Sequence, residues 1–352
     1  MARWPRAGSL LRGLWDTSSA TPPGVARDDA PVDPELADTD AAEARARRDA
    51  LRPDPAKIGG VGDAPFAALP DPATLFAARA ERFDALAADH PLGDYLRFLA
   101  ALTRVQDSMR AALPPLPPPD EAALALRLQH AMPPLSPQDL DGDAAFAATL
   151  DALLRGVAAL DAALVPDAAR EAAARLGGRP AAERTALAAA VSAGATPVDH
   201  LAEAVFAAAA LQVHLARRAA TLDVGALHAV ADGVCPACGS APVASLVVGW
   251  TRASKARYCA CPLCATQWNH VRVKCTACGA TDAVLYHNVP EVSPDVAVET
   301  CGTCRSYIKH MQQHAEPRLD PVADDIASYA LDLLIREDGF RRGGLNPLFV
   351  QG

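Results

Sequence analysis

Eight of the nine cysteines in this chain form four Cys-x-x-Cys pairs, all within its last third. The pairs are Cys235/Cys238, Cys261/Cys264, Cys275/Cys278 and Cys301/Cys304. A Cys-x-x-Cys turn points two thiolates at one ion, and two such turns supply the four sulfurs of a tetrahedral metal site. The chemistry that these residues predict is therefore metal binding.

The four pairs repeat as one unit. In each half of the segment 22 residues separate one pair from the next, and the second half follows the first at an offset of 40 residues. A fixed period of this kind indicates an internal duplication. We predict two tandem rubredoxin-like or zinc-ribbon modules, each binding one metal ion and each too small to fold well without it. The expected ligands of the first ion are Cys235, Cys238, Cys261 and Cys264, and those of the second are Cys275, Cys278, Cys301 and Cys304. If the modules are independent, Cys235→Ser should empty the first site and leave the second filled.

The spacing leaves the metal open between zinc and iron, because both accept four thiolates in a tetrahedron. From spacing alone zinc is the safer expectation. A [4Fe–4S] cluster usually draws on less regular cysteine runs, and thioredoxin-like redox pairs need a βαβ setting that a 40-residue repeat does not fit. Four sulfurs complete each shell and leave no position for a substrate. Since no nucleophile–base pair or phosphate loop stands out either, we expect a protein that is not an enzyme.

Residues beside the pairs have structural interpretations. Gly239 and Gly279 each follow the second cysteine of a pair and supply the positive φ that such a turn favours. Cys259 lies two residues before Cys261 on an expected strand, so the two side chains point the same way; we interpret it as a small, half-buried residue, with a spare or exchanging ligand as the alternative. Nearby histidines are expected at the surface or in hydrogen bonds, and nearby aromatic residues in the module cores, with a partner-binding face as the alternative. These residues are His270, His287, His310 and His314, and Trp250, Tyr258, Trp268, Tyr286 and Tyr307.

The rest of the chain must position the modules, and its composition favours helices. Of the 352 residues 51% are hydrophobic, but only 5% are aromatic, and alanine is abundant. Asp71 and Pro72 are expected to open a first helix. Further helices are expected at about 92–113, 121–131, 143–164, 167–176, 180–193 and 197–219. Short β-type runs follow, "SLVVGW", "RYCAC", "HVRVKC", "AVLYHNV" and "VAVETC", and a last helix is expected between Asp320-Pro321 and Gly339.

These elements predict an α plus small β fold, in which an all-α N-terminal domain precedes the two four-cysteine modules and a C-terminal helix. The expected boundaries are a disordered extension at 1–60, the helical domain at 61–230, the modules at 231–272 and 273–312, and the C-terminal helix and tail at 313–352.

Charge and hydropathy limit the partners and the location. The net charge of the chain is −9, and the segment 235–304 has five basic and four acidic residues. Proteins that bind nucleic acid usually carry a basic surplus, so we expect no nucleic acid partner. No run of about 18 apolar residues predicts a membrane span, and no signal-peptide core follows the first arginines. We expect a cytoplasmic protein, in which reduced thiols favour metals over disulfides.

Several longer motifs resemble the formate dehydrogenase accessory protein family, FdhE, over roughly residues 60–350. They are "HPLGDYLRFLAAL", "CPACGSAPVAS", "CPLCATQWNHVRVKCTACG", "CRSYIK" and "DPVADDIASYALDLLIREDGFRRGGLNP". The resemblance implies a cytoplasmic maturation factor that binds the catalytic subunit of formate dehydrogenase during assembly. It implies two iron ions, one in each rubredoxin-like site, against the zinc that spacing favours, and it is compatible with a homodimer. It assigns no role to Cys259.

The motif at 320–347 and the negative net charge of the chain favour such a binding and assembly factor. The alternatives are a zinc-ribbon protein that binds nucleic acid and a rubredoxin-type electron carrier. The near-neutral modules argue against the first alternative, and a redox-silent metal would exclude the second.

Overall fold

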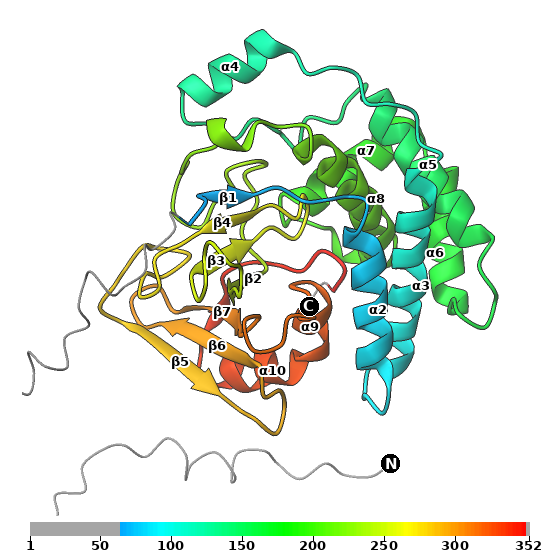
Figure 1. The fold of residues 1–352 in the computed structure, drawn as a ribbon. Coiled ribbons are helices and arrows are strands. Elements are labelled where there is room, and N and C mark those ends of the chain that lie inside the picture. Colours follow the sequence, from blue (N-terminus) through cyan, green and yellow to red (C-terminus); the bar gives the residue numbers. More distant parts are fainter. Residues whose placement is uncertain (1–63, 350–352) are drawn as a thin grey trace, which may run out of the picture. The chain divides into compact units, whose positions relative to one another are not determined.

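The computed structural model describes residues 64–349, which lie in the compact unit Val61–Gly352. The extension expected at 1–60 lies outside the described residues. Within them, helices precede a mixed sheet that contains both four-cysteine segments, as the sequence predicts (Figure 1).

The helical region is built around one central helix. The helices are α2 (Leu75–Ala87), α3 (Gly93–Arg110), α4 (Glu121–Gln129), α5 (Ala144–Ala158), α6 (Asp167–Gly178), α7 (Ala181–Ser192) and α8 (Leu201–Ala219), with short 3-10 turns at Val198–His200 and Val224–Ala226. Helices α3, α5, α6 and α7 all pack against α8. The run Ala207 to Ala210 in α8 is fully buried, because methyl side chains let neighbouring helices approach closely from several directions.

The first helix begins later than Asp71 and Pro72 suggest. The backbone carbonyl of Asp71 accepts from the N–H groups of Thr74 and Leu75, and its side chain accepts from Ala73. These bonds form a turn before α2, so the expected cap lies four residues ahead of the regular helix.

Strands of the two cysteine segments form one sheet. Its strands are β1 (Ala67–Ala68), β2 (Ala244–Val247), β3 (Arg257–Ala260), β4 (Gln267–Asn269), β5 (Val284–Asn288), β6 (Val296–Cys301), β7 (Ser306–Met311) and β8 (Arg341–Arg342). Within residues 64–349 the order is β1-β4-β3-β2-β7-β6-β5, with β8 paired to β7. Each segment contributes an antiparallel three-stranded unit, and the parallel pair β2–β7 joins the units.

Three local expectations were wrong. The strand expected in "HVRVKC" lies earlier, at β4, and the residues after β4 form a turn. Strand β7 was not expected, although it is the strand through which the second unit joins the first. The single C-terminal helix is two helices, α9 (Ala323–Ala327) and α10 (Tyr329–Glu337). The break is at Ser328, whose hydroxyl donates to the carbonyl of Asp324 at 2.6 Å and so competes with the backbone ladder.

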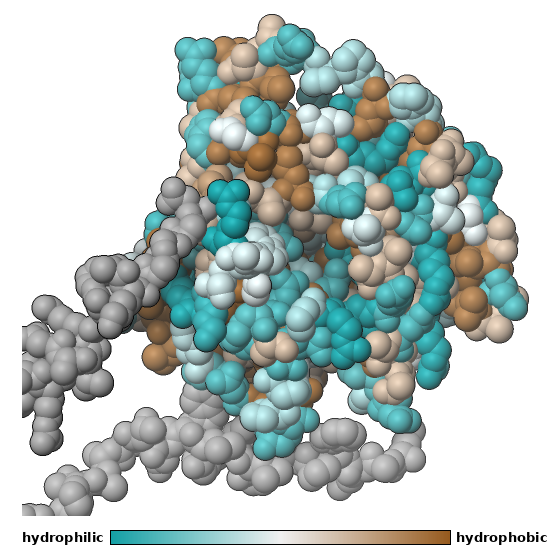
Figure 2. Space-filling model, in the orientation of Figure 1, coloured by the Kyte–Doolittle hydropathy of each residue, from teal (hydrophilic) through white to brown (hydrophobic). Residues whose placement is uncertain are grey.

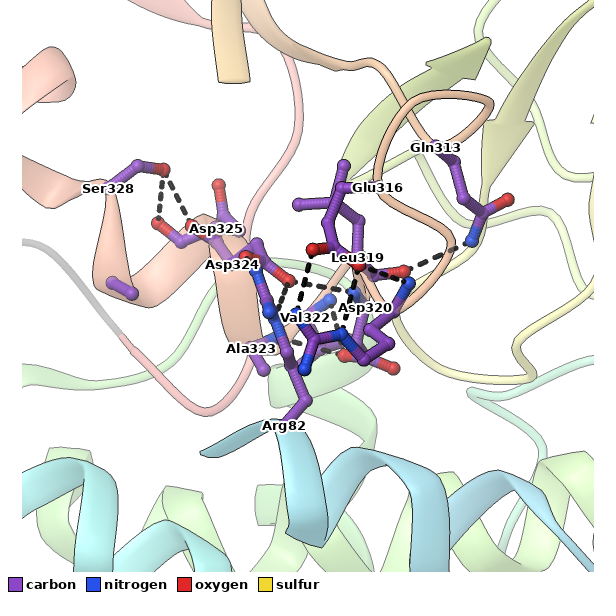
Figure 3. A network of polar contacts seen from close by, with 12 residues as sticks. Arg82, Gln313, Glu316, Leu319, Asp320, Val322, Ala323, Asp324, Asp325 and Ser328 are labelled. Carbon is purple, nitrogen blue, oxygen red and sulfur yellow. Dashed lines mark hydrogen bonds and ion pairs between the residues drawn. The ribbon is translucent and has the colours of Figure 1, made fainter. Parts of the chain in front are cut away.

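A polar network joins the helical region to the C-terminal segment. Arg82 reaches from α2 to Asp324 on α9, and its Nε and Nη2 donate to that carboxylate at 2.9 and 2.6 Å (Figure 3). Asp320 accepts from the first N–H groups of α9 and pairs with Arg79 of α2 at 3.0 Å. More than 200 residues of chain separate these partners, so the pairs fix a long-range contact.

This network makes stability depend on pH. Burial raises the pKa of Asp324 to about 6, although Arg82 opposes the shift. The folded chain therefore binds this proton more tightly than the unfolded chain, and the contribution of Asp324 to stability falls as pH rises through 6. Between pH 5 and pH 7 we expect the unfolding free energy of the wild type, relative to Asp324→Asn, to fall by about 1 kcal/mol. Urea titrations of both proteins measure this difference, and a constant or rising difference would contradict the assignment.

Helix α4 differs from the other helices because none of its residues is buried. Asp120 caps it and accepts from the N–H groups of Ala122 and Ala123. Leu126 is 56% exposed and Met132, just beyond the helix, is 46% exposed. Figure 2 shows apolar residues gathering at the upper left, where α4 lies in Figure 1. No helix within residues 64–349 combines the length and apolar character that a membrane span requires.

Candidate metal centres

The first four cysteines converge on one buried point, which we call cluster 1. Cys235, Cys238, Cys261 and Cys264 are each at most 2% exposed, and their sulfurs all lie within 4.8 Å of one another. Cys235 and Cys238 come from the turn before β2, and the other pair comes from the turn between β3 and β4. The hairpin β2–β3 therefore brings the second turn back beside the first.

The other four cysteines form cluster 2 in the same way. Cys275 and Cys278 precede β5, Cys301 is the last residue of β6, and Cys304 lies between β6 and β7. Their sulfurs also lie within 4.8 Å of one another. Cluster 2 is less protected than cluster 1, because Cys278 is exposed and Cys304 is half-buried.

Sulfur separations test whether these residues fit a metal. The Cys235–Cys264 and Cys238–Cys261 sulfurs are 3.6 and 3.4 Å apart, and the equivalent pairs of cluster 2 are 3.8 and 3.7 Å apart. All are free thiols, since a disulfide would require about 2.05 Å. An ion bound at about 2.3 Å by four sulfurs at the corners of a tetrahedron sets them about 3.8 Å apart. The residues therefore fit a tetrahedral four-sulfur ion, and zinc and iron fit this donor set equally well.

Backbone geometry explains why these turns form locally. In three of the four turns the N–H of the first cysteine donates to the carbonyl five residues later, for example from Cys235 to Ser240 at 2.9 Å. The residue after the second cysteine has positive φ in every turn. Gly239 and Gly279 adopt it without strain, as expected, whereas Ala265 and Arg305 adopt it at φ 58° each, which costs about 1 kcal/mol for a residue with a Cβ.

Helix α8 holds cluster 1 against the helical region. Gln212 is 1% exposed, and its amide donates to the carbonyl of Pro262, between Cys261 and Cys264, at 2.9 Å. Gln106 of α3 donates in turn to the side chain of Gln212 at 3.1 Å and to a carbonyl of α8. The two side-chain amides thus form a buried series of hydrogen bonds from α3 to the turn of cluster 1.

Gln212→Leu keeps the volume of this contact but removes its hydrogen bonds. The carbonyl of Pro262 then stays buried without a partner, which costs about 1–3 kcal/mol, and the amide of Gln106 keeps only its bond to the carbonyl of Ala209. We expect the thermal midpoint to fall and cluster 1 to lose its metal to a chelator faster. Gln267→Leu is the matched control, because Gln267 begins β4 directly after the turn and does not belong to this series of hydrogen-bonded amides. An unchanged midpoint and release rate would show that the amides do not support the site.

A buried arginine from the first unit holds the second. Arg257 on β3 is 1% exposed and pairs with Glu299 on β6 at 2.5 Å. Its Nη1 donates to the carbonyls of Val271 and Lys274 at 3.1 and 2.8 Å, directly before Cys275. The spacing analysis missed both Arg257 and Gln212, since nothing local marks them as partners of the turns.

The remaining candidates near the clusters have structural contacts. Cys259 lies on β3 outside both clusters and is fully rather than half buried, and burial raises the pKa of its thiol to about 12. His310 is buried and forms a hydrogen bond with Ser245 at 2.8 Å. Burial lowers the pKa of its imidazole to about 3. Most of the aromatic residues are core residues, as expected, while Tyr286 is 41% exposed. Within residues 64–349 cysteines alone make up the two groups of possible ligands.

Sequence comparisons match the described chain almost from end to end. Family models described as FdhE N-terminal, FdhE central domain and FdhE C-terminal domain match residues 64–232, 234–272 and 273–349. The chain belongs to the FdhE family. An FdhE homolog of Rhizobium meliloti (strain 1021) is 41% identical over 302 residues, which cover 85% of this chain and 98% of the relative. An FdhE homolog of Pseudomonas aeruginosa (strain PAO1) is 36% identical over 284 residues, covering 79% and 91%.

Structure comparison agrees with this assignment. The crystal structure of the FdhE protein from Pseudomonas aeruginosa is similar to this chain with a TM-score of 0.72 and 34% identity. The match covers 81% of this chain and 99% of that protein. The FdhE family resemblance read from the motifs is therefore confirmed, together with the helical region followed by the sheet and its two four-cysteine clusters.

Proposed function

We propose that this protein is an accessory factor that binds the catalytic subunit of formate dehydrogenase during its assembly. Membership of the FdhE family, over nearly all of residues 64–349, is the observation that carries the proposal. In this proposal the protein acts in the cytoplasm and is not an enzyme, and a homodimer remains part of the expectation. The domain boundaries given from the sequence also remain predictions.

The eight paired cysteines are the proposed metal ligands, with one iron ion in each cluster and zinc as the alternative. While all four cysteines bind the ion the shell is closed, so the ion would supply structure and would not bind a substrate. Cluster 1 lies where α8, β2 and β3 meet, so an ion there would stabilise the contact between the sheet and the helices. Elemental analysis of protein purified without oxygen distinguishes iron from zinc.

The charge balance of the sequence supports a protein partner over nucleic acid. The chain carries 33 basic and 42 acidic residues. A protein that binds through phosphates releases counterions and needs a basic surface, which this balance does not favour. Binding to DNA or RNA that weakens steeply with salt would contradict this part of the proposal.

Affinity purification from the host tests the proposed partner. A tagged chain would be expressed while formate dehydrogenase is being made, and co-purifying proteins would be identified by mass spectrometry. We expect the formate dehydrogenase catalytic subunit with the wild type and less of it with Cys275→Ser/Cys278→Ser. Cys259→Ser, which alters a buried cysteine outside both clusters, is the matched control. Failure to recover the subunit with folded, metal-loaded wild type would overturn the proposal.

A further inference from the structure

Hydroxyl groups contact the sulfur in three of the four Cys-x-x-Cys turns. Each hydroxyl belongs to the residue two positions after the second cysteine. They are those of Ser240, Thr266 and Ser306, which lie 3.3, 3.2 and 2.9 Å from the sulfurs of Cys238, Cys264 and Cys304. A thiolate can only accept hydrogen bonds, so beside a metal-bound sulfur each hydroxyl is the donor and stabilises the negative charge.

The third turn lacks this donor. Ala280 stands at the position that Ser240 occupies 40 residues earlier, and it offers Cys278 only its backbone N–H. The duplicated units are therefore alike in their four sulfurs and different at this one hydroxyl.

The same cysteine is the exposed one. Cys275 and Cys301 are each 2% exposed and Cys304 is half-buried, whereas Cys278 is exposed. All four ligands of cluster 1 are buried, and the helical region covers that cluster through Gln212. Water and small solutes can thus reach the sulfur of Cys278 without any rearrangement of the fold.

We propose that cluster 2 is an exchangeable metal site whose leaving ligand is Cys278, and that cluster 1 retains its metal. Cys278 dissociates and takes up a proton from solvent, and an incoming thiolate or chelator occupies the position that it leaves. No electron is transferred, and three buried or half-buried cysteines still hold the ion. A site with three protein ligands and one open position can accept a ligand from another molecule, which the closed cluster 1 cannot do. The incoming group would therefore be a soft donor, such as a cysteine thiolate of a partner protein or a small thiol.

This inference rests on the proposed function only in requiring that both clusters bind metal. The test uses the full chain loaded without oxygen with two Zn²⁺ ions, which is then mixed with excess EDTA. The zinc that remains bound is measured after rapid desalting at a series of times. We expect one ion to leave about 10-fold faster than the other or more, because release from cluster 1 requires local opening of the core.

Two variants and a chemical probe identify the labile ligand. Ala280→Ser restores the missing hydroxyl and should slow the fast release about 3- to 10-fold. Ser240→Ala removes the equivalent hydroxyl from cluster 1 and should leave the fast release unchanged. Brief treatment with iodoacetamide, followed by peptide mass mapping, should modify Cys278 before any other paired cysteine.

The outcomes separate this inference from the proposed function. Equal release rates from a chain with two ions, or modification of Cys278 no earlier than its neighbours, would overturn the inference alone. A folded chain that binds fewer than two ions would overturn the metal centres of the proposed function and the inference with them. If Ala280→Ser does not fold, the release rates of the wild type and the order in which its cysteines are modified still test the inference.

Discussion

Cys235→Ser will remove both metals and unfold the sheet, whereas Cys275→Ser/Cys278→Ser will remove one metal and leave the sheet folded. The repeat alone suggests independent sites, but the structure joins the units through the central pair β2–β7. Cys235 lies in the turn before β2, and it is fully buried. A structural four-ligand zinc site contributes about 10–16 kcal/mol of binding free energy, which is comparable to the whole stability of a folded domain, about 5–15 kcal/mol. Loss of cluster 1 should therefore remove the support of β2 and, through β7, that of cluster 2.

Metal content and circular dichroism, measured on the same samples, test this asymmetry. We expect two ions per chain in the wild type, none in Cys235→Ser and one in Cys275→Ser/Cys278→Ser. The sheet signal should be kept in the wild type and the double variant and lost in Cys235→Ser. Cys259→Ser, buried on β3 but outside the clusters, should retain both ions. One ion remaining in Cys235→Ser would show that the units fold independently despite their shared sheet.

Cluster membership could be predicted from the sequence because each turn is local. A backbone hydrogen bond between residues five apart, Cys235 and Ser240, closes the first turn. The same hydrogen bond recurs 40 residues later in cluster 2, between Cys275 and Ala280. The hydroxyls at Ser240, Thr266 and Ser306 follow the same repeat, so a residue-by-residue comparison of the two units would have revealed both them and the exception at Ala280.

Pairing between distant segments could not be predicted in the same way. Ala244 lies opposite Lys309 in the β2–β7 pair, and no turn of either segment specifies that contact. Strand β7 was missed because its sequence, "SYIKHM", contains a lysine and a histidine, which usually lie at the surface. Both are buried here because other segments supply their partners.

The C-terminal motif shows how burial changes the interpretation of a charged sequence. Acidic residues such as those of the motif at 320–347 usually lie at the surface. In the structure Asp325 and Asp332 are at most 1% exposed and face Lys309 and Arg342. Burial opposes ionisation of Asp325, but Arg342 and Lys309 outweigh it and lower its pKa. These residues therefore stabilise the packing of α9 and α10 on the sheet.

Lys309→Met should be among the most destabilising single substitutions outside the clusters. The ammonium of Lys309 is fully buried, 2.5 Å from Asp332 and 3.4 Å from Asp325. The two cations Lys309 and Arg342 balance the carboxylates of Asp325 and Asp332. Removing one cation therefore leaves an uncompensated negative charge in the core. Breaking a buried ion pair in this way costs about 3–5 kcal/mol, which corresponds to a fall of about 10 °C in the thermal midpoint. Urea and thermal unfolding of the metal-loaded protein measure both quantities.

A second substitution distinguishes lost charge from lost packing. Lys309→Met/Asp332→Asn removes one charge of each sign and leaves Asp325 paired with Arg342, so the double variant should be more stable than Lys309→Met alone. Arg318→Met breaks an exposed ion pair with Glu316 and should leave the midpoint unchanged, because solvent screens such pairs. If the two substitutions instead destabilise additively, Lys309 acts through the packing of its side chain, and the charge balance of the group does not maintain the C-terminal fold.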